Sequence, residues 1–101
     1  MGVPVILTPQ SQDDLQEIVS FIARDNPIQA VKFGDALIDK ALSVATFPER
    51  GRVVPELQLE SVREIIHGSY RIIYELFRDP DAVFVLRFWH AARGTQQIES
   101  R

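Results

Sequence analysis

The chain has 101 residues, of which 46% are hydrophobic, so it is the usual size of one domain and can bury one core. We therefore expect a single domain spanning residues 1–101. A net charge of −3 counts against a broad nucleic-acid-binding surface, and the lack of cysteine excludes disulfides and thiolate metal sites.

No segment of the sequence indicates export or membrane insertion. The N-terminus, Met1–Pro4, lacks a basic region followed by a long apolar run. The longest apolar run, Ala82–Leu86, is too short to span a bilayer. The two histidines lack the spacing of a metal site. We therefore expect a cytoplasmic protein that needs no metal and no cofactor.

The N-terminal half predicts one strand followed by two helices. Residues 3–7 form a short apolar run, in which Pro4 is acceptable at the start of a strand. Thr8 and Pro9 predict the N-cap and first residue of a helix that ends near Asp25. Apolar residues recur along it at helical spacing: Leu15, Ile18, Val19 and Ile22.

A second helix follows directly, because Asn26 and Pro27 repeat the same cap-plus-proline pattern. Its apolar residues form one stripe: Ala30, Phe33, Leu37, Ala41, Val44 and Ala45. Two helices joined by so short a link are expected to form an antiparallel hairpin. Residues 47–52 then break the helix, and the chain is predicted to be irregular to about Ser61.

The C-terminal half predicts three strands. Residues 62–77 and 82–90 are rich in β-branched and aromatic side chains, with turn residues at 68–69 and 79–81. Links this short require antiparallel pairing. The predicted order is β-α-α-β-β-β, an α+β fold in which both helices pack on one face of an antiparallel sheet.

Four stretches of this sequence carry a resemblance to a known family. They are Phe47 to Glu56, Arg63 to Ile65, Gly68 to Tyr74, and Val85 to Arg87 followed by His90 and Arg93. Together they resemble the RelE/ParE superfamily, the toxins of bacterial type II toxin–antitoxin modules. The resemblance implies a curved sheet backed by a helical hairpin. It also implies a protein antitoxin, encoded nearby, whose tail wraps the toxin and which supplies the contact with operator DNA.

The superfamily contains two activities, so the resemblance leaves the target open. RelE-like members cut mRNA in the ribosomal A site, whereas ParE-like members block DNA gyrase. The lysines of the RelE branch are absent near Val62 and Glu64, and no tyrosine follows Tyr74. The ending His-Ala-Ala-Arg, residues 90–93, is similar to that of ParE-like plasmid-stabilisation proteins. We therefore favour a growth-inhibiting gyrase toxin, with a metal-independent mRNA endonuclease and an inactive homologue that still binds antitoxin as alternatives.

The nuclease alternative names three residues. The resemblance places a catalytic arginine at Arg71, which would clamp the phosphate, while Glu56 acts as base and His90 as acid. This set requires the loop that carries Glu56 to fold back over the sheet. Strand alternation puts Arg71 and Tyr70 on opposite faces of the sheet. If Tyr70 faces the helices, Arg71 is therefore on the open face. A salt bridge to an acid on the same or a neighbouring strand explains Arg71 equally well.

Two further sets of residues are candidates for binding partners. The first is expected to contact the target and contains Arg63, Arg87, Arg93 and Tyr70. The second lies beyond the main helical stripes and is expected to contact the antitoxin: Phe21, Ile28, Val31 and Ile38. A small domain also leaves some apolar residues exposed without a function. Trp89 is expected to close the core rather than to stack on a base.

Overall fold

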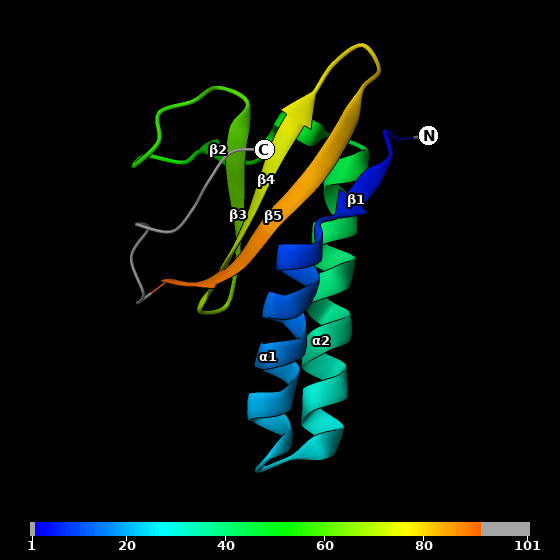
Figure 1. Ribbon diagram of the computed structural model, residues 1–101, viewed down its shortest axis with the longest axis vertical. Coiled ribbons are helices and arrows are strands. Elements are labelled where there is room, and N and C mark those ends of the chain that lie inside the picture. Colours follow the sequence, from blue (N-terminus) through cyan, green and yellow to red (C-terminus); the bar gives the residue numbers. More distant parts are fainter. Residues whose placement is uncertain (1, 92–101) are drawn as a thin grey trace.

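The computed structural model describes residues 2–91, which form one five-stranded sheet covered on one face by a helical hairpin (Figure 1). The elements in chain order are β1 (Val5–Leu7), α1 (Pro9–Ala23), α2 (Pro27–Leu42), the 3₁₀ turns η1 (Ser43–Ala45) and η2 (Pro48–Arg50), β2 (Arg52–Val53), β3 (Val62–His67), β4 (Tyr70–Phe77) and β5 (Ala82–His90). Figure 1 shows the hairpin running well past the end of the sheet, so the α1–α2 turn projects from the body of the protein. No helix in this described part is long and apolar enough to cross a membrane.

The two helices begin where the sequence predicts. The side chain of Thr8 accepts a hydrogen bond from the Ser11 amide, and that of Asn26 accepts one from the Gln29 amide. A proline follows each cap, where its missing N–H costs nothing. α1 ends at Ala23, slightly before the expected end near Asp25.

A glycine lets the helices approach closely. A Cβ at Gly34 of α2 would lie 2.8 Å from the Val19 Cγ2 of α1, so a larger residue would push the helices apart. The predicted stripe omitted Gly34, because glycine adds no apolar side chain to the pattern. The other buried residues of α2 are Ala30, Leu37 and Ala41, which the stripe did contain.

The sheet is mixed rather than purely antiparallel. Strands β3, β4 and β5 form the predicted antiparallel meander. β1, however, pairs in parallel with β5, with Val5 opposite Val83. β2 was not predicted at all, because Arg52–Val53 is too short to show an alternating pattern. The strand order is β1-β5-β4-β3-β2.

One extra residue in β5 exchanges the two faces of that strand. Tyr74 of β4 is opposite Val85, but Ile73 is opposite Arg87, so Leu86 has no partner of its own. Such a bulge shifts the alternation of every later residue. As a result Val85 and Phe88 both belong to the core cluster on the helix side, although strict alternation would place them on opposite faces.

Tyr74 fixes the loop between η2 and β2. Its hydroxyl is buried, accepts a hydrogen bond from the Gly51 amide at 2.9 Å and donates one to the Pro48 carbonyl at 2.8 Å. A Cβ at Gly51 would lie 2.4 Å from that hydroxyl, so only glycine fits. Burial raises the pKa of Tyr74, and the hydrogen bond from Gly51 partly opposes the rise.

Candidate functional site

Four alternating charges cross the face of the sheet opposite the helices. Glu64 of β3 accepts hydrogen bonds from the Nε atoms of Arg52 and Arg71, each at 2.5 Å. The other end of the Arg71 guanidinium donates to both carboxylate oxygens of Glu56, at 3.0 and 3.3 Å. We call Arg52, Glu64, Arg71 and Glu56 the charge ladder.

The middle of the charge ladder is buried and its ends are in solvent. The side chains of Arg71 and Glu64 are 8% and 0% exposed, whereas those of Glu56 and Arg52 are 42% and 64% exposed. Burial alone would lower the pKa of Arg71, but its hydrogen bonds to Glu56 and Glu64 raise it instead. The hydrogen bond from Arg71 holds the pKa of Glu56 below its ordinary value. Both groups are therefore charged at neutral pH.

The loop between β2 and β3 brings Glu56 to this face. Val54 and Leu57 of the loop pack on the sheet with Ile73, Leu86 and Trp89. The amides of Leu57 and Gln58 both donate to the Val54 carbonyl, which turns the chain back on itself. The fold-back that Glu56 needs is thus present. Arg71 also lies on the expected face, opposite the helices. There it forms an ion pair with Glu64 of the neighbouring strand, as the salt-bridge alternative for Arg71 predicted.

His90 lies on the other face of the sheet. In the register of β4 and β5 it is opposite Tyr70, and the two rings meet edge to face with centroids 5.0 Å apart. Tyr70 in turn packs against Phe33 of α2, with centroids 5.6 Å apart. The sheet therefore separates His90 from Arg71 and Glu56. Without the bulge at Leu86, alternation from Val85 would have placed His90 on the same face as Arg71.

Arg63 does not share a face of the sheet with Arg71. Arg63 is opposite Tyr74, on the helix side, and donates to the carbonyls of Glu49 and Gly51 at 3.1 Å each. It therefore supports the loop that Tyr74 also holds, rather than joining Arg71. Arg93 lies outside the described residues.

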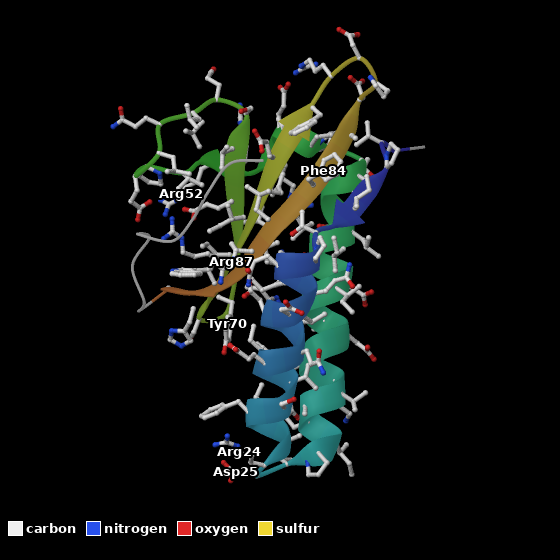
Figure 2. All side chains as sticks on the ribbon, in the orientation of Figure 1. Arg24, Asp25, Arg52, Tyr70, Phe84 and Arg87 are labelled. Atoms are coloured by element: carbon white, nitrogen blue, oxygen red, sulfur yellow. The ribbon has the colours of Figure 1, made fainter. Side chains whose placement is uncertain are left out.

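Arg87 makes a contact with α1 that the sequence did not reveal. It donates to both oxygens of Asp14, at 2.6 and 2.9 Å, and its guanidinium lies 4.6 Å from the Trp89 ring centroid. Asp14 also accepts a hydrogen bond from the Phe88 amide. It thereby satisfies the edge of β5 at a residue past the three that pair with β1. Figure 2 shows Arg87 where the sheet meets α1 and Arg52 at the β2 edge of the sheet. The sequence signal for this ion pair was the position of Asp14, which lies on the apolar side of the amphipathic helix α1.

The predicted antitoxin-binding residues lie on the helices, at the surface. Phe21, Ile28 and Val31 are 66%, 73% and 61% exposed, and Ile38 is partly buried. Phe21 lines a groove of about 790 Å³ between α1 and the ends of β4 and β5, together with Tyr70 and His90. This groove thus brings together residues predicted for three different roles: antitoxin binding for Phe21, target binding for Tyr70 and catalysis for His90.

A second cavity, of about 510 Å³, contains no predicted site residue. It lies at the other end of β4 and β5, where Phe47, Leu76 and Val83 give it apolar walls. An exposed ion pair between Arg78 and Glu49 lies among its lining residues. Within residues 2–91, no group of histidine, aspartate or glutamate side chains is arranged to hold a metal ion.

Comparisons with known proteins agree on one kind of molecule. Residues 5–94 match the sequence model of the ParE toxin of the type II toxin–antitoxin system parDE. The fold is similar to a chain of the chromosomal ParDE system from P. aeruginosa, with a TM-score of 0.72 and 14% identity over 87% of this chain and 95% of that one. It is also similar to a chain of the toxin–antitoxin complex RelBE2 from Mycobacterium tuberculosis, with a TM-score of 0.67 and 21% identity over 89% and 99%. No curated protein sequence is similar enough to add a further relative.

Proposed function

The chain belongs to the ParE toxin family of type II toxin–antitoxin systems, and from this premise we propose that it arrests growth by inhibiting DNA gyrase when free of its antitoxin. Membership of the ParE/RelE superfamily makes it a toxin with a protein antitoxin as partner. The proposal concerns the target, and places the protein in the bacterial cytoplasm, where gyrase acts. As proposed, it contacts operator DNA only through the antitoxin complex.

The separation of His90 from the charge ladder carries this proposal. Cleavage of RNA through its 2′-hydroxyl needs a base, a cation and an acid around one phosphate. Arg71 and Glu56 are together, but His90 is beyond the sheet, beside Tyr70. The three side chains are therefore not gathered on one face of the sheet, as a shared phosphate would require. This arrangement supports a toxin that binds its target rather than cutting it.

The state of Arg71 gives independent support. Its three guanidinium nitrogens already donate to Glu64 and Glu56. A phosphate that approaches Arg71 would compete with Glu56, which is held ionised by that arginine. A carboxylate whose pKa is lowered is also a weak base at neutral pH.

A ribosome-dependent mRNA endonuclease is the second candidate. The observation that favours it is the close approach of Glu56 to Arg71, which sequence reasoning required for that activity. In this alternative, movement of the β2–β3 loop would free Arg71 for a phosphate. A toxin homologue that has lost activity but binds antitoxin is the third candidate.

One induction experiment separates the three candidates. The protein is expressed without antitoxin, and plasmid supercoiling and transcript ends are measured in the same cells. Loss of supercoiling with intact transcripts is the expected result. Cuts at ribosome-occupied codons with normal supercoiling would establish the nuclease, and normal growth would establish the inactive homologue.

Variants in the β2–β3 loop sharpen the test. Glu56→Gln removes the base but retains an acceptor for Arg71, and Glu60→Gln changes an exposed glutamate of the same loop as a control. A nuclease predicts that Glu56→Gln loses transcript cleavage while Glu60→Gln retains it. Arg71→Ala is expected to abolish toxicity in a nuclease without changing antitoxin affinity, so an unchanged toxicity would exclude a catalytic Arg71.

A further inference from the structure

Helix α2 has a second apolar stripe that the described structure leaves largely exposed. Its positions, 28, 31, 35, 38 and 42, are spaced alternately by three and four residues. Four of them are apolar, and three of these are well exposed: Ile28 at 73%, Val31 at 61% and Leu42 at 45%. Ile38 is partly buried, and the middle position is the exposed acid Asp35. We call these five residues the α2 seam.

The α2 seam is distinct from the face of α2 that forms the core. At 3.6 residues per turn, its centre lies about 110° around the helix axis from the buried stripe of Ala30, Gly34, Leu37 and Ala41. Its spacing is that of the a and d positions of a coiled-coil heptad. From Ile28 to Leu42 it extends about 21 Å at 1.5 Å per residue. A partner helix of about four turns matches this surface in shape and length.

Asp35 determines the chemistry of that partner. None of the ion pairs found within residues 2–91 involves Asp35. Covering it with an apolar residue would strand a carboxylate away from water, which is costly unless a cation pairs with it. Lys32 and Asp39 flank the seam, so its local charge is negative. The complementary helix is therefore apolar with a lysine or arginine opposite Asp35.

The same residue argues against a second copy of this chain as the occupant. Asp35 is the middle position of the seam, with two apolar positions on each side. Two identical helices packed in register or antiparallel about this centre would bring their Asp35 carboxylates together. Like charges at the centre of a seam oppose association.

We propose that the α2 seam docks an amphipathic helix of the antitoxin, and that Asp35 selects the partner and fixes its register by pairing with a basic residue. This inference rests on the antitoxin partnership described above and does not depend on whether gyrase or the ribosome is the target. A polar residue at a single a position has this role in other helical assemblies, where it lowers affinity but excludes wrong pairings.

The test measures binding of the purified toxin to the antitoxin encoded beside it, by isothermal titration calorimetry. Asp35→Lys is expected to weaken binding by roughly tenfold to a hundredfold, and Asp35→Asn by less. Glu60→Lys makes the same charge change in the β2–β3 loop and is expected to bind like the wild type. Charge reversal of one lysine or arginine on the antitoxin helix is expected to restore binding to Asp35→Lys.

The outcomes separate this inference from the assignment on which it rests. If the wild type does not bind the antitoxin, the partnership itself is wrong. If the wild type binds and Asp35→Lys binds equally well, only the α2 seam is wrong. Melting of each variant, followed by circular dichroism, verifies that an exposed helical substitution has left the fold intact.

A second variant tests the selection role without any partner. Asp35→Leu makes the seam continuously apolar and removes the repulsion between identical copies. We expect this variant to form a dimer at concentrations where the wild type is monomeric, as measured by sedimentation equilibrium. A wild type that dimerises as strongly as Asp35→Leu would overturn the claim that Asp35 excludes self-association.

Discussion

On the helix side of the sheet, Ile72 lies in an apolar cluster with Leu37, Val44 and Phe88, whereas on the other side Ile73 shares its layer with Glu64 and Arg71. The first layer is closed by two helices. The second is closed by an irregular loop through Val54 and Leu57. The two faces of one strand thus have different covers and different chemistry.

Because of this difference, the two faces contribute differently to the stability of the fold and to the shape of its surface. Apolar burial is non-directional and tolerates changes of sequence, so the helix side supplies most of the stability. Buried ion pairs add little net stability, but removing one partner is strongly destabilising because the other charge is left buried and unpaired. The charge ladder therefore serves to hold the β2–β3 loop in one position over the sheet, which fixes the shape of that surface.

The largest expected effect comes from comparing the two neighbouring isoleucines. Both are fully buried, so Ile72→Ala and Ile73→Ala remove the same atoms. We expect Ile72→Ala to cost about 4 kcal/mol of unfolding free energy and Ile73→Ala about 2 to 3 kcal/mol, because the loop can settle into the space more easily than helices can. Urea denaturation measures both. Equal losses would show that the loop is as firmly packed as the hairpin.

A smaller effect is expected from breaking the middle of the charge ladder. Arg71→Met keeps most of the side-chain volume but leaves the buried Glu64 with Arg52 as its only cation in the ladder. We expect a loss of about 2 to 4 kcal/mol at neutral pH. Adding Glu64→Gln is expected to recover part of that loss, since the uncompensated charge is gone. Additive losses in this double-mutant cycle would contradict a coupled ladder.

The smallest effect is the pH dependence of Glu56. Its pKa in the folded protein is below the ordinary value of 4.5, so its pairing with Arg71 stabilises the fold above that pH. The stabilisation is lost as the pH falls through the folded pKa and the carboxylate takes up a proton. Glu56→Gln is therefore expected to lower the urea midpoint near neutral pH but not at about pH 3. Because Glu56 is 42% exposed, the effect should stay below about 1 kcal/mol. A difference that grows in acid would refute this pairing.

Local sequence signals predicted the elements but not all of their partners. The caps at Thr8 and Asn26 and the strands from Val62 to His90 depend on nearby residues, and they were read correctly. The parallel pairing of β1 with β5 joins residues about 78 positions apart, as Val5 with Val83 shows, and no local pattern encodes it. The antiparallel meander of β3, β4 and β5 was predicted correctly, and only the parallel pairing of β1, which makes the sheet mixed, was missed.

The sequence predicted the positions of Arg71 and Glu56 in the candidate site, but not that of His90, which follows the bulge in β5. Alternation within β4 placed Arg71 correctly, and the fold-back of Glu56 was stated as a condition that the structure meets. The face of His90 depends on the extra residue Leu86, and a one-residue shift leaves no trace in composition or periodicity. Arg63 was expected to contact the target, but the register of β3 places it on the helix side, and that register could not be known from the sequence.

The position of β5 within the sheet has a consequence for how the protein is made. β5 is the last element of the described chain, yet it pairs with β1 on one edge and β4 on the other. Asp14 of α1 and the N-cap Thr8 also contact it. During synthesis the first strand and first helix emerge long before the strand that completes their contacts. The sheet can close only after residues 82–90 have left the ribosome. A chain interrupted before that point lacks the frame of the toxin, so incomplete translation products are expected to be harmless.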